Sequence, residues 1–175
     1  PLAVTYLATS SKSVPGKVAV IPSPPACVVV TYTTPKDAGA LLWLDAELTA
    51  TKKQPMLFTQ SQAILARTWI PLQDTPSVRF TYDATIRVLK GAMAVMSATN
   101  PQKRADDGVY RFTMDKPIPS YLMALAVGDL DFKAIGPRTG VYAEPSVVEK
   151  AAFEFAEVEK MMTVGEKLYS YPSMA

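Results

Sequence analysis

The clearest hydrophobic pattern in the chain is a strict alternation over residues 77–88. Apolar side chains occupy the even positions and polar side chains the odd positions between them: Val78, Phe80, Tyr82, Ala84, Ile86 and Val88 against Arg79, Thr81, Asp83, Thr85 and Arg87. Because successive side chains of a strand point to opposite faces of a sheet, a period of two is typical of a strand with one buried face. This segment is therefore predicted to be a long, half-buried β-strand.

Shorter strand-like segments recur on both sides of it, separated by proline and turn residues. The chain has 15 prolines, which interrupt helices and confine strands to short pieces. Residues 116–120 must be extended, because each proline in that segment pushes the preceding residue out of the helical region. Strands are predicted over residues 18–21, 27–33, 62–69, 94–98, 109–114, 122–127 and 131–135. This spacing predicts a mainly β domain, built as an antiparallel sandwich or a curved open sheet.

Two polar turns are predicted from their glycine residues. Residues 106–108 (Asp-Asp-Gly) lie between two strand-like segments and have the composition of a hairpin turn. Residues 136–139 (Gly-Pro-Arg-Thr) lack the glycine spacing of a phosphate-binding loop. We expect this second turn to join the last strand to the connector that precedes the C-terminal helix.

After Pro145 the hydrophobic period changes from two to between three and four residues. Apolar side chains recur at that spacing between residues 146 and 169: Val148, Ala151, Ala152, Phe155, Val158 and Met162. The pattern predicts one long amphipathic helix, with Ser146 and Glu149 as a capping box at its start. Phe153 and Phe155 would lie on different faces, one in the core and one toward a second surface. The helix either folds back on the sheet or begins a further domain.

Composition excludes several classes of function. Charged residues make up 19% of the chain and the net charge is +2, without a long basic cluster, so no nucleic-acid interface is expected. No apolar run approaches the ~20 residues that span a bilayer, and no signal peptide is recognised. Cys27 is the single cysteine, read as a buried inert thiol, and the chain has no histidine to activate it. The compartment stays open, either cytoplasmic or periplasmic/secreted.

Several segments, in order along the chain, resemble one protein family. They include residues 40–44 (Ala-Leu-Leu-Trp-Leu), 56–64 (Met-Leu-Phe-Thr-Gln-Ser-Gln-Ala-Ile), 70–80, 117–128, 135–139 and 148–155. In this combination they resemble the N-terminal β domain and following helix of the gluzincin zinc aminopeptidases. Within that family, the Gln-x-Gln form at Gln60 and Gln62 and the Gly-Pro-Arg-Thr element favour the leukotriene hydrolase/aminopeptidase-like branch.

The resemblance implies a saddle-like antiparallel β domain over residues 1–144, incomplete at its N-terminus, and the first helix of a catalytic domain over residues 145–175. The β domain of this family packs on a thermolysin-like catalytic domain, which favours the second placement of the helix. The family's zinc motif, H-E-x-x-H, does not occur in this chain. The resemblance therefore implies zinc in the whole protein and none bound by this chain, which is expected to be a fragment.

Gln60, Ser61 and Gln62 are the substrate-binding residues that the resemblance implies. In related enzymes this segment reaches into the active-site cleft and contacts the amino-terminal residue of the peptide. Amides suit that role, because they offer a donor and an acceptor without having to ionise. From the residues alone, two glutamines two positions apart on a strand would form one solvated face. No catalytic residue is expected in this chain.

Arg67 and Asp74 flank the turn at residues 70–73. We expect them to form a structural arginine–carboxylate pair that closes this loop. Asp74 as a general base is the functional alternative, although no neighbouring residue in the sequence supports it.

The function predicted for the whole protein is that of a zinc metalloaminopeptidase, which removes N-terminal residues from peptides. This chain would supply the β domain that contacts the amino end of the peptide substrate. The alternative is a non-catalytic, β-rich scaffold or binding module.

Overall fold

The computed structural model describes residues 5–7, 18–20 and 29–170, and within them the predicted mainly β class is confirmed. The strands are β1 (Thr5–Leu7), β2 (Val18–Val20), β3 (Leu41–Leu44), β4 (Met56–Thr59), β5 (Arg79–Arg87), β6 (Met93–Met96), β7 (Val109–Pro119), β8 (Leu125–Gly128), β9 (Asp131–Ala134) and β10 (Gly140–Ala143). Three short 3-10 helices are η1 (Ala46–Leu48), η2 (Ala66–Thr68) and η3 (Ser120–Leu122). The helices α1 (Val148–Glu154) and α2 (Val158–Tyr169) follow. Cys27 lies outside the described residues.

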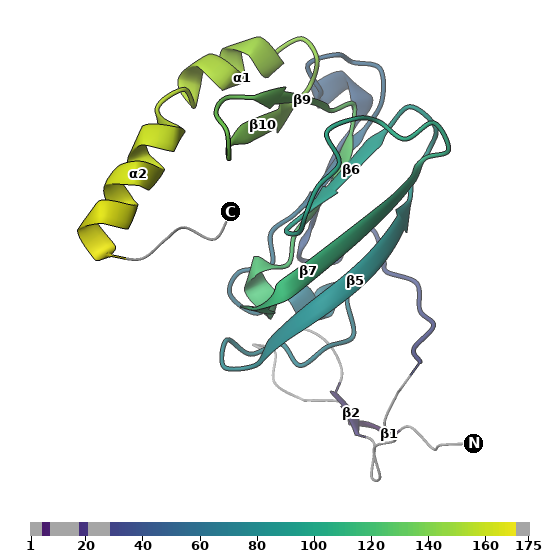
Figure 1. Cartoon of the computed structure of the whole chain (residues 1–175). Helices are drawn as coiled ribbons and strands as arrows, with labels where there is room; N and C mark the ends of the chain where they lie inside the picture. Colours follow the sequence, from purple (N-terminus) through teal and green to yellow (C-terminus); the bar gives the residue numbers. More distant parts are fainter. Residues whose placement is uncertain (1–4, 8–17, 21–28, 171–175) are drawn as a thin grey trace. The chain divides into compact units, whose positions relative to one another are not determined.

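The strands form antiparallel sheets, in which chain neighbours are often not sheet neighbours (Figure 1). One sheet has the strand order β3-β4-β8-β6, and the two longest strands, β5 and β7, pair with each other. The remaining pairs are β1 with β2 and β9 with β10. Segment 62–69, predicted as a strand, instead forms turns and η2, and no strand is present at residues 29–33.

The alternation that predicts β5 is confirmed residue by residue. Its polar positions are exposed, whereas its apolar positions are half-buried. One face of β5 therefore contributes to the interior, because a strand with period two presents all its apolar side chains on one side. The extended segment 116–119 is also confirmed, because it forms the end of β7.

Two turn predictions need correction. The turn at 106–108 forms, and Gly108 adopts a positive φ of 68°, but the strands that it joins do not make a hairpin. β6 pairs with β8, and β7 pairs with β5. The turn at 136–139 joins β9 to a strand that the sequence did not suggest, β10, whose residue Tyr142 packs its ring against Phe132 at 4.9 Å. Sequence patterns identify turns, but strand pairing is decided by tertiary packing.

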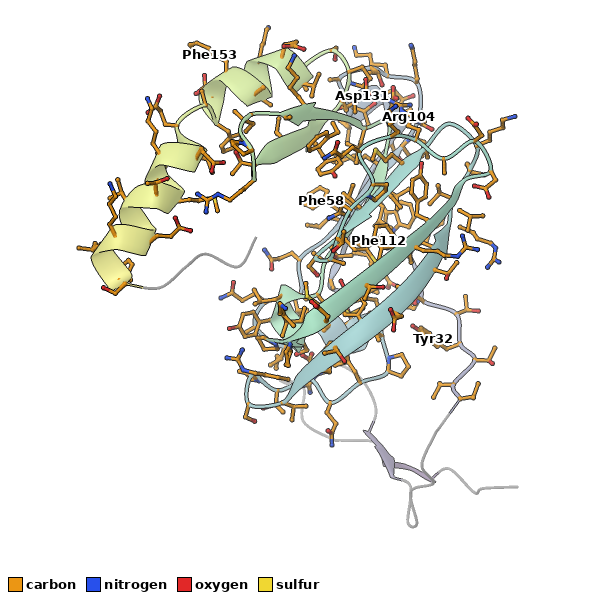
Figure 2. The ribbon with its side chains drawn as sticks, viewed as in Figure 1. Tyr32, Phe58, Arg104, Phe112, Asp131 and Phe153 are labelled. Atoms are coloured by element: carbon orange, nitrogen blue, oxygen red, sulfur yellow. The ribbon has the colours of Figure 1, made fainter. Side chains whose placement is uncertain are left out.

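The C-terminal helical segment is confirmed over residues 148–169, with a turn at 155–157 dividing it into α1 and α2. The capping box was wrong, because α1 has Val147 as its N-cap and no side-chain cap. The expectation that one of two phenylalanines is core was also wrong. Phe153 and Phe155 are both exposed, and Figure 2 shows Phe153 pointing away from the strands.

The chain divides into two compact units, and strands β3, β4, β5 and β7 contribute residues to both. The first unit comprises Pro1–Leu42, Thr59–Thr81 and Asp115–Ala124, and the second comprises Trp43–Phe58, Tyr82–Met114 and Leu125–Ala175. The described core of the first unit combines Pro119 and Met123 with small and polar residues: Ala38, Ala40, Ala66, Ser61, Asp74 and Ser120. Larger side chains dominate the core of the second unit: Met93, Met96, Tyr110, Phe112, Leu130 and Val148. Among the described residues, no helix is long and apolar enough to cross a membrane.

Candidate functional site

The predicted substrate-binding segment follows β4 directly and lies in the first unit. Its two glutamines are exposed, whereas Ser61 between them is only 2% exposed. The Gln60 backbone N–H donates to the carbonyl of Ala40 at 2.9 Å, which continues the β-type pairing one residue beyond the strand. The segment therefore has two exposed amide side chains, one on each side of the buried Ser61.

The buried Ser61 is held by two hydrogen bonds within the first unit, one to a residue eight positions away in the chain and one to a residue 62 positions away. The Ser61 hydroxyl donates to the carbonyl of Met123 at 3.3 Å and accepts from the indole N–H of Trp69 at 3.2 Å. A buried hydroxyl with both its donor and an acceptor engaged fixes the local main chain. The Ser61 hydroxyl is therefore occupied by bonds within the first unit, and the main chain of Ser61 is the part of the residue that lies beside the exposed glutamines.

The main chain around the glutamines is further constrained by local bonds. The Gln62 backbone N–H donates to Oε1 of Gln60 at 3.0 Å, and the Leu65 N–H donates to the Ser61 carbonyl at 2.9 Å. The peptide bond between Gln62 and Ala63 is cis. This local bond occupies Oε1 of Gln60, and the amide nitrogen is the other polar group of that side chain. Its N–H groups are donors suited to a carbonyl oxygen of a ligand.

Arg67 and Asp74 contact each other through three hydrogen bonds. The Arg67 backbone N–H and Nε donate to Oδ2 of Asp74 at 3.0 and 3.1 Å, and Nη2 donates to the Asp74 carbonyl at 2.6 Å. The Asp74 side chain is 1% exposed and also accepts a short hydrogen bond from the hydroxyl of Ser120 at Oδ1. Both oxygens of this buried carboxylate are therefore occupied by hydrogen bonds within the chain.

The 3-10 helix η3 connects these two clusters. Its first residue, Ser120, binds Asp74, and the carbonyl of Met123 just after η3 binds Ser61. The hydroxyl of Thr68 also stabilises this region, since it accepts a hydrogen bond from the Ala40 N–H at 3.1 Å. Ser120, Trp69 and Thr68 were not predicted as supporting residues; the partners of Ser120 and Thr68 lie 46 and 28 residues away, and the Trp69 partner, eight residues away, follows no regular spacing. The serine that directly follows the prolines at 117 and 119 would have been the available sequence signal.

A second charged cluster, in the second unit, is structural. Arg104 Nη2 contacts Asp129 at 2.7 Å and Asp131 at 2.9 Å, and Nη1 donates to the Gly91 carbonyl at 2.8 Å. Figure 2 shows Arg104 and Asp131 beside each other. Burial opposes the charge of Arg104, but hydrogen bonds to Asp129 and Asp131 hold its pKa above the ordinary value. The guanidinium therefore stays charged and ties the connection between β8 and β9 to the loop before β6.

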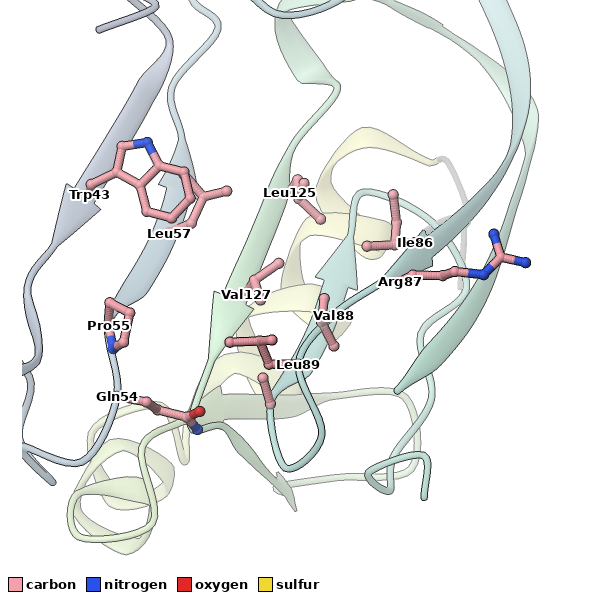
Figure 3. Close-up of a pocket in the computed structure, with 11 residues that line it drawn as sticks. Trp43, Gln54, Pro55, Leu57, Ile86, Arg87, Val88, Leu89, Leu125 and Val127 are labelled. Carbon is pink, nitrogen blue, oxygen red and sulfur yellow. The ribbon is translucent and has the colours of Figure 1, made fainter. Parts of the chain in front are cut away.

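An apolar groove of about 560 Å³ lies within the second unit. Figure 3 shows Trp43 and Leu57 on one side and Ile86 and Val88 on the other, with Leu125 and Val127 between them. Arg87 points away from this space, because it occupies the outward position of β5. The groove has no cluster of charged side chains that converge on a ligand, so its lining is that of an apolar surface and not of a reaction centre.

No zinc site is present in the part of the chain that the structure describes. No three histidine, cysteine, aspartate or glutamate side chains there are grouped so that they could hold a metal ion. The whole sequence lacks histidine, which the nitrogen-ligated catalytic zinc sites of hydrolases require. The residues of this chain therefore do not fit a catalytic zinc ion.

Comparison with known proteins gives a consistent result. Residues 41–122 match the peptidase M1 N-terminal domain. Leukotriene A-4 hydrolase of Xenopus laevis is 47% identical over 141 residues, which cover 78% of this chain and 23% of that protein. Aminopeptidase B of Mus musculus is 46% identical over 141 residues, which cover 80% of this chain and 21% of that protein.

Solved structures agree with the sequence comparison. The structure of native yeast LTA4 hydrolase superposes with a TM-score of 0.80 at 31% identity, covering 94% of this chain and 26% of that one. The same yeast protein in complex with bestatin gives a TM-score of 0.76 at 34% identity, with the same coverage. This chain spans about a quarter of the length of these relatives. Over residues 41–122 it matches the N-terminal domain of the peptidase M1 family, and its relatives include leukotriene A-4 hydrolase and aminopeptidase B.

Proposed function

We propose that this chain is the N-terminal domain of a zinc-dependent aminopeptidase and that Gln60 and Gln62 contact the amino end of the peptide substrate. The observation that carries the proposal is the pair of exposed amides held on either side of the buried Ser61. The match to the peptidase M1 N-terminal domain over residues 41–122 supports the activity, and the hydrogen bonds that hold the segment suit a binding role. Rigid placement matters, because a contact group that must be ordered on binding loses part of its binding free energy.

Zinc in this proposal belongs to residues outside the chain. The chain has no histidine, and its described residues hold no metal-binding cluster. Its contribution would be limited to orienting the substrate with neutral amides. A negatively charged partner for the ammonium group of the substrate would come from the catalytic domain, since Asp74 is buried and already paired.

The surface of α2 supports packing against a further domain. Met161, Val164 and Leu168 recur at helical spacing and are 62–71% exposed. An exposed apolar stripe of this kind is typical of an interface that is covered in the complete protein. We propose that the thermolysin-like catalytic domain covers it and that the domain boundary lies at residues 144–145, so that the helical segment begins the catalytic domain.

The test uses the longer protein that carries this domain, with an aminoacyl anilide as substrate. We expect zinc-dependent hydrolysis, and Gln62→Ala should lower kcat/KM about tenfold, as expected for loss of a hydrogen bond to a charged or polar substrate group. Gln73→Ala is the matched control, because Gln73 is also an exposed glutamine of the first unit.

The two parts of the proposal fail separately. A longer protein that binds no zinc and hydrolyses no aminoacyl anilide contradicts the aminopeptidase activity. An active protein in which both Gln60→Ala and Gln62→Ala match the Gln73→Ala control retains the activity but removes the glutamines from substrate binding.

A further inference from the structure

The two C-terminal helices are attached to the second unit in different ways. α1 contacts both β9 and β10 and buries Val148, which is 8% exposed. α2 has no buried residue. In Figure 1, the turn between β9 and β10 points toward the region where α1 gives way to α2. Apolar packing therefore explains the position of α1 and does not by itself explain that of α2.

The side of α2 that is partly covered is identified by its burial pattern. Its half-buried residues are Val158, Glu159, Met162, Gly165 and Glu166. These positions follow the spacing i, i+1, i+4, i+7 and i+8, which defines one face of a helix. Two of the five are acidic, and the apolar stripe at 161, 164 and 168 faces another direction. The covered face of α2 is thus an unusually charged one.

The turn between β9 and β10 supplies the complementary charge. Arg138 Nε donates to Oε1 of Glu159 at 2.7 Å, and its Nη1 donates to Oε1 of Glu166 at 2.6 Å. The hydroxyl of Thr139 donates to the other oxygen of Glu159 at 3.0 Å. One guanidinium therefore bridges two carboxylates that lie seven residues, or two helical turns, apart on α2.

Glycine at position 136 allows this close approach. A Cβ atom there would lie 2.6 Å from Oε2 of Glu159 and 2.9 Å from the hydroxyl of Thr139. The turn is tightened by two bonds to the Thr139 carbonyl, from the N–H groups of Ile135 and Gly136 at 3.0 and 3.2 Å. The geometry of the turn and the spacing of the two glutamates are therefore matched to each other.

We propose that the ion pairs of Arg138 with Glu159 and Glu166 hold α2 in place, and that they can break while the β-sheets and α1 stay folded. These ion pairs are called the latch below. An isolated helix of 12 residues is marginal in water, so α2 depends on contacts outside itself. Since these contacts are charged and close to solvent, salt weakens them, unlike the apolar packing of α1. The turn at residues 155–157 gives the backbone a place to move between the two helices.

The directions of two pKa shifts agree with ion pairing between Arg138 and the two glutamates. Hydrogen bonds to Glu159 and Glu166 raise the pKa of Arg138, and the hydrogen bond from Arg138 lowers the pKa of Glu159. The latch is independent of the proposed aminopeptidase activity, since it concerns how the helix is held and not what the protein binds.

Hydrogen exchange by mass spectrometry on the 175-residue chain tests the latch. Arg138→Gln should increase exchange over residues 158–169 about threefold to tenfold, with β5, β7 and α1 unchanged. The double variant Glu159→Gln/Glu166→Gln should give the same increase. Lys133→Gln is the matched control, because it removes the ion pair of Lys133 with Glu149 on α1 at 3.0 Å and leaves α2 untouched.

Salt gives an independent measurement. Exchange over residues 158–169 should rise in 1 M sodium chloride for the unmodified chain and change little for Arg138→Gln. Unchanged exchange in α2 for Arg138→Gln, or an equal increase in β5 and β7, would overturn the proposal, since the arginine would then be dispensable or merely part of global stability.

Discussion

The hydroxyl of Ser120 donates a short hydrogen bond to the buried carboxylate of Asp74, 46 residues earlier in the chain. This contact joins η3 to the loop that Arg67 closes. Met123, just beyond η3, holds Ser61 through its carbonyl. The exposed glutamines beside Ser61 therefore depend on a buried polar network and not on a large apolar core.

Ser120→Ala should lower the free energy of unfolding by about 1–3 kcal/mol, because the buried Asp74 carboxylate loses a hydrogen-bond donor. Urea denaturation followed by circular dichroism measures the change. Ser77→Ala is the control, since the bond of its hydroxyl to the Thr75 hydroxyl at 3.2 Å is exposed, and it should be nearly neutral. Equal effects of the two substitutions would show that the buried contact contributes nothing specific.

Ser61→Ala and Gln62→Ala should separate stability from binding. Ser61→Ala leaves the Trp69 indole N–H without its acceptor and should cost about 1–2 kcal/mol of stability. Gln62→Ala removes an exposed side chain and should leave the unfolding midpoint within experimental error. Urea unfolding of the two variants side by side is the measurement. A destabilised Gln62→Ala would show that the Gln62 side chain stabilises the fold.

Gly108→Ala should destabilise the second unit by about 2 kcal/mol or more. Gly108 has a φ of 68°, and an added Cβ would lie 2.5 Å from the Val88 carbonyl oxygen. Gly165→Ala makes the same chemical change inside α2, where nothing lies within 4 Å of the added atom. That substitution should favour the helix by about 1 kcal/mol. The thermal unfolding midpoints of the two variants are the measurement. A shift of both midpoints in the same direction would contradict this prediction.

Acid should loosen α2 before it unfolds the sheets. The hydrogen bond from Arg138 lowers the folded-state pKa of Glu159, with the hydroxyl of Thr139 acting in the same direction and burial opposing both. A group with a lowered pKa stabilises the fold at any pH above its unfolded value, and this contribution disappears as the pH falls through the folded value.

Among the described residues, Arg138 and Thr139 of the turn face Glu159, and Glu166 shares the same guanidinium. Ellipticity at 222 nm should therefore be constant from pH 7 to about 5 and decrease below about pH 4, where glutamate ordinarily titrates. Glu159→Gln should show lower helicity at pH 7 and a smaller acid-induced loss. Superimposable titrations of the two proteins would contradict a role of this carboxylate.

Leu168→Lys should distinguish a surface position from an interface position. Leu168 is 71% exposed, so the stability of the 175-residue chain should change by less than about 0.5 kcal/mol. In the longer protein, a catalytic domain that covers the stripe would make the same substitution destabilising by about 2 kcal/mol, since a charge would be buried. Thr163→Lys is the control on another face of α2. Equal thermal midpoints for the two longer variants would argue against this interface.

The sequence by itself determined the local structure wherever a period was strong. The alternation over residues 77–88 specified β5, the proline-rich segment specified the extended end of β7, and the change of period after Pro145 specified the helical segment. The family resemblance was also visible in the sequence, because Gln60 to Gln62 and the Gly-Pro-Arg-Thr turn are local strings. Each of these features depends on residues that are close together in the chain.

Tertiary structure alone decided what pairs with what. The turn at 106–108 has the composition of a hairpin turn, yet β6 pairs with β8 because sheet order depends on non-local hydrogen bonds. Nothing local in the sequence indicates that Ser120 completes the bonding of Asp74, or that Arg138 bridges two carboxylates on α2. Charge complementarity across such distances has no sequence period. The sequence therefore determined the elements and the candidate glutamines, and the packed chain decided which residues hold them in place.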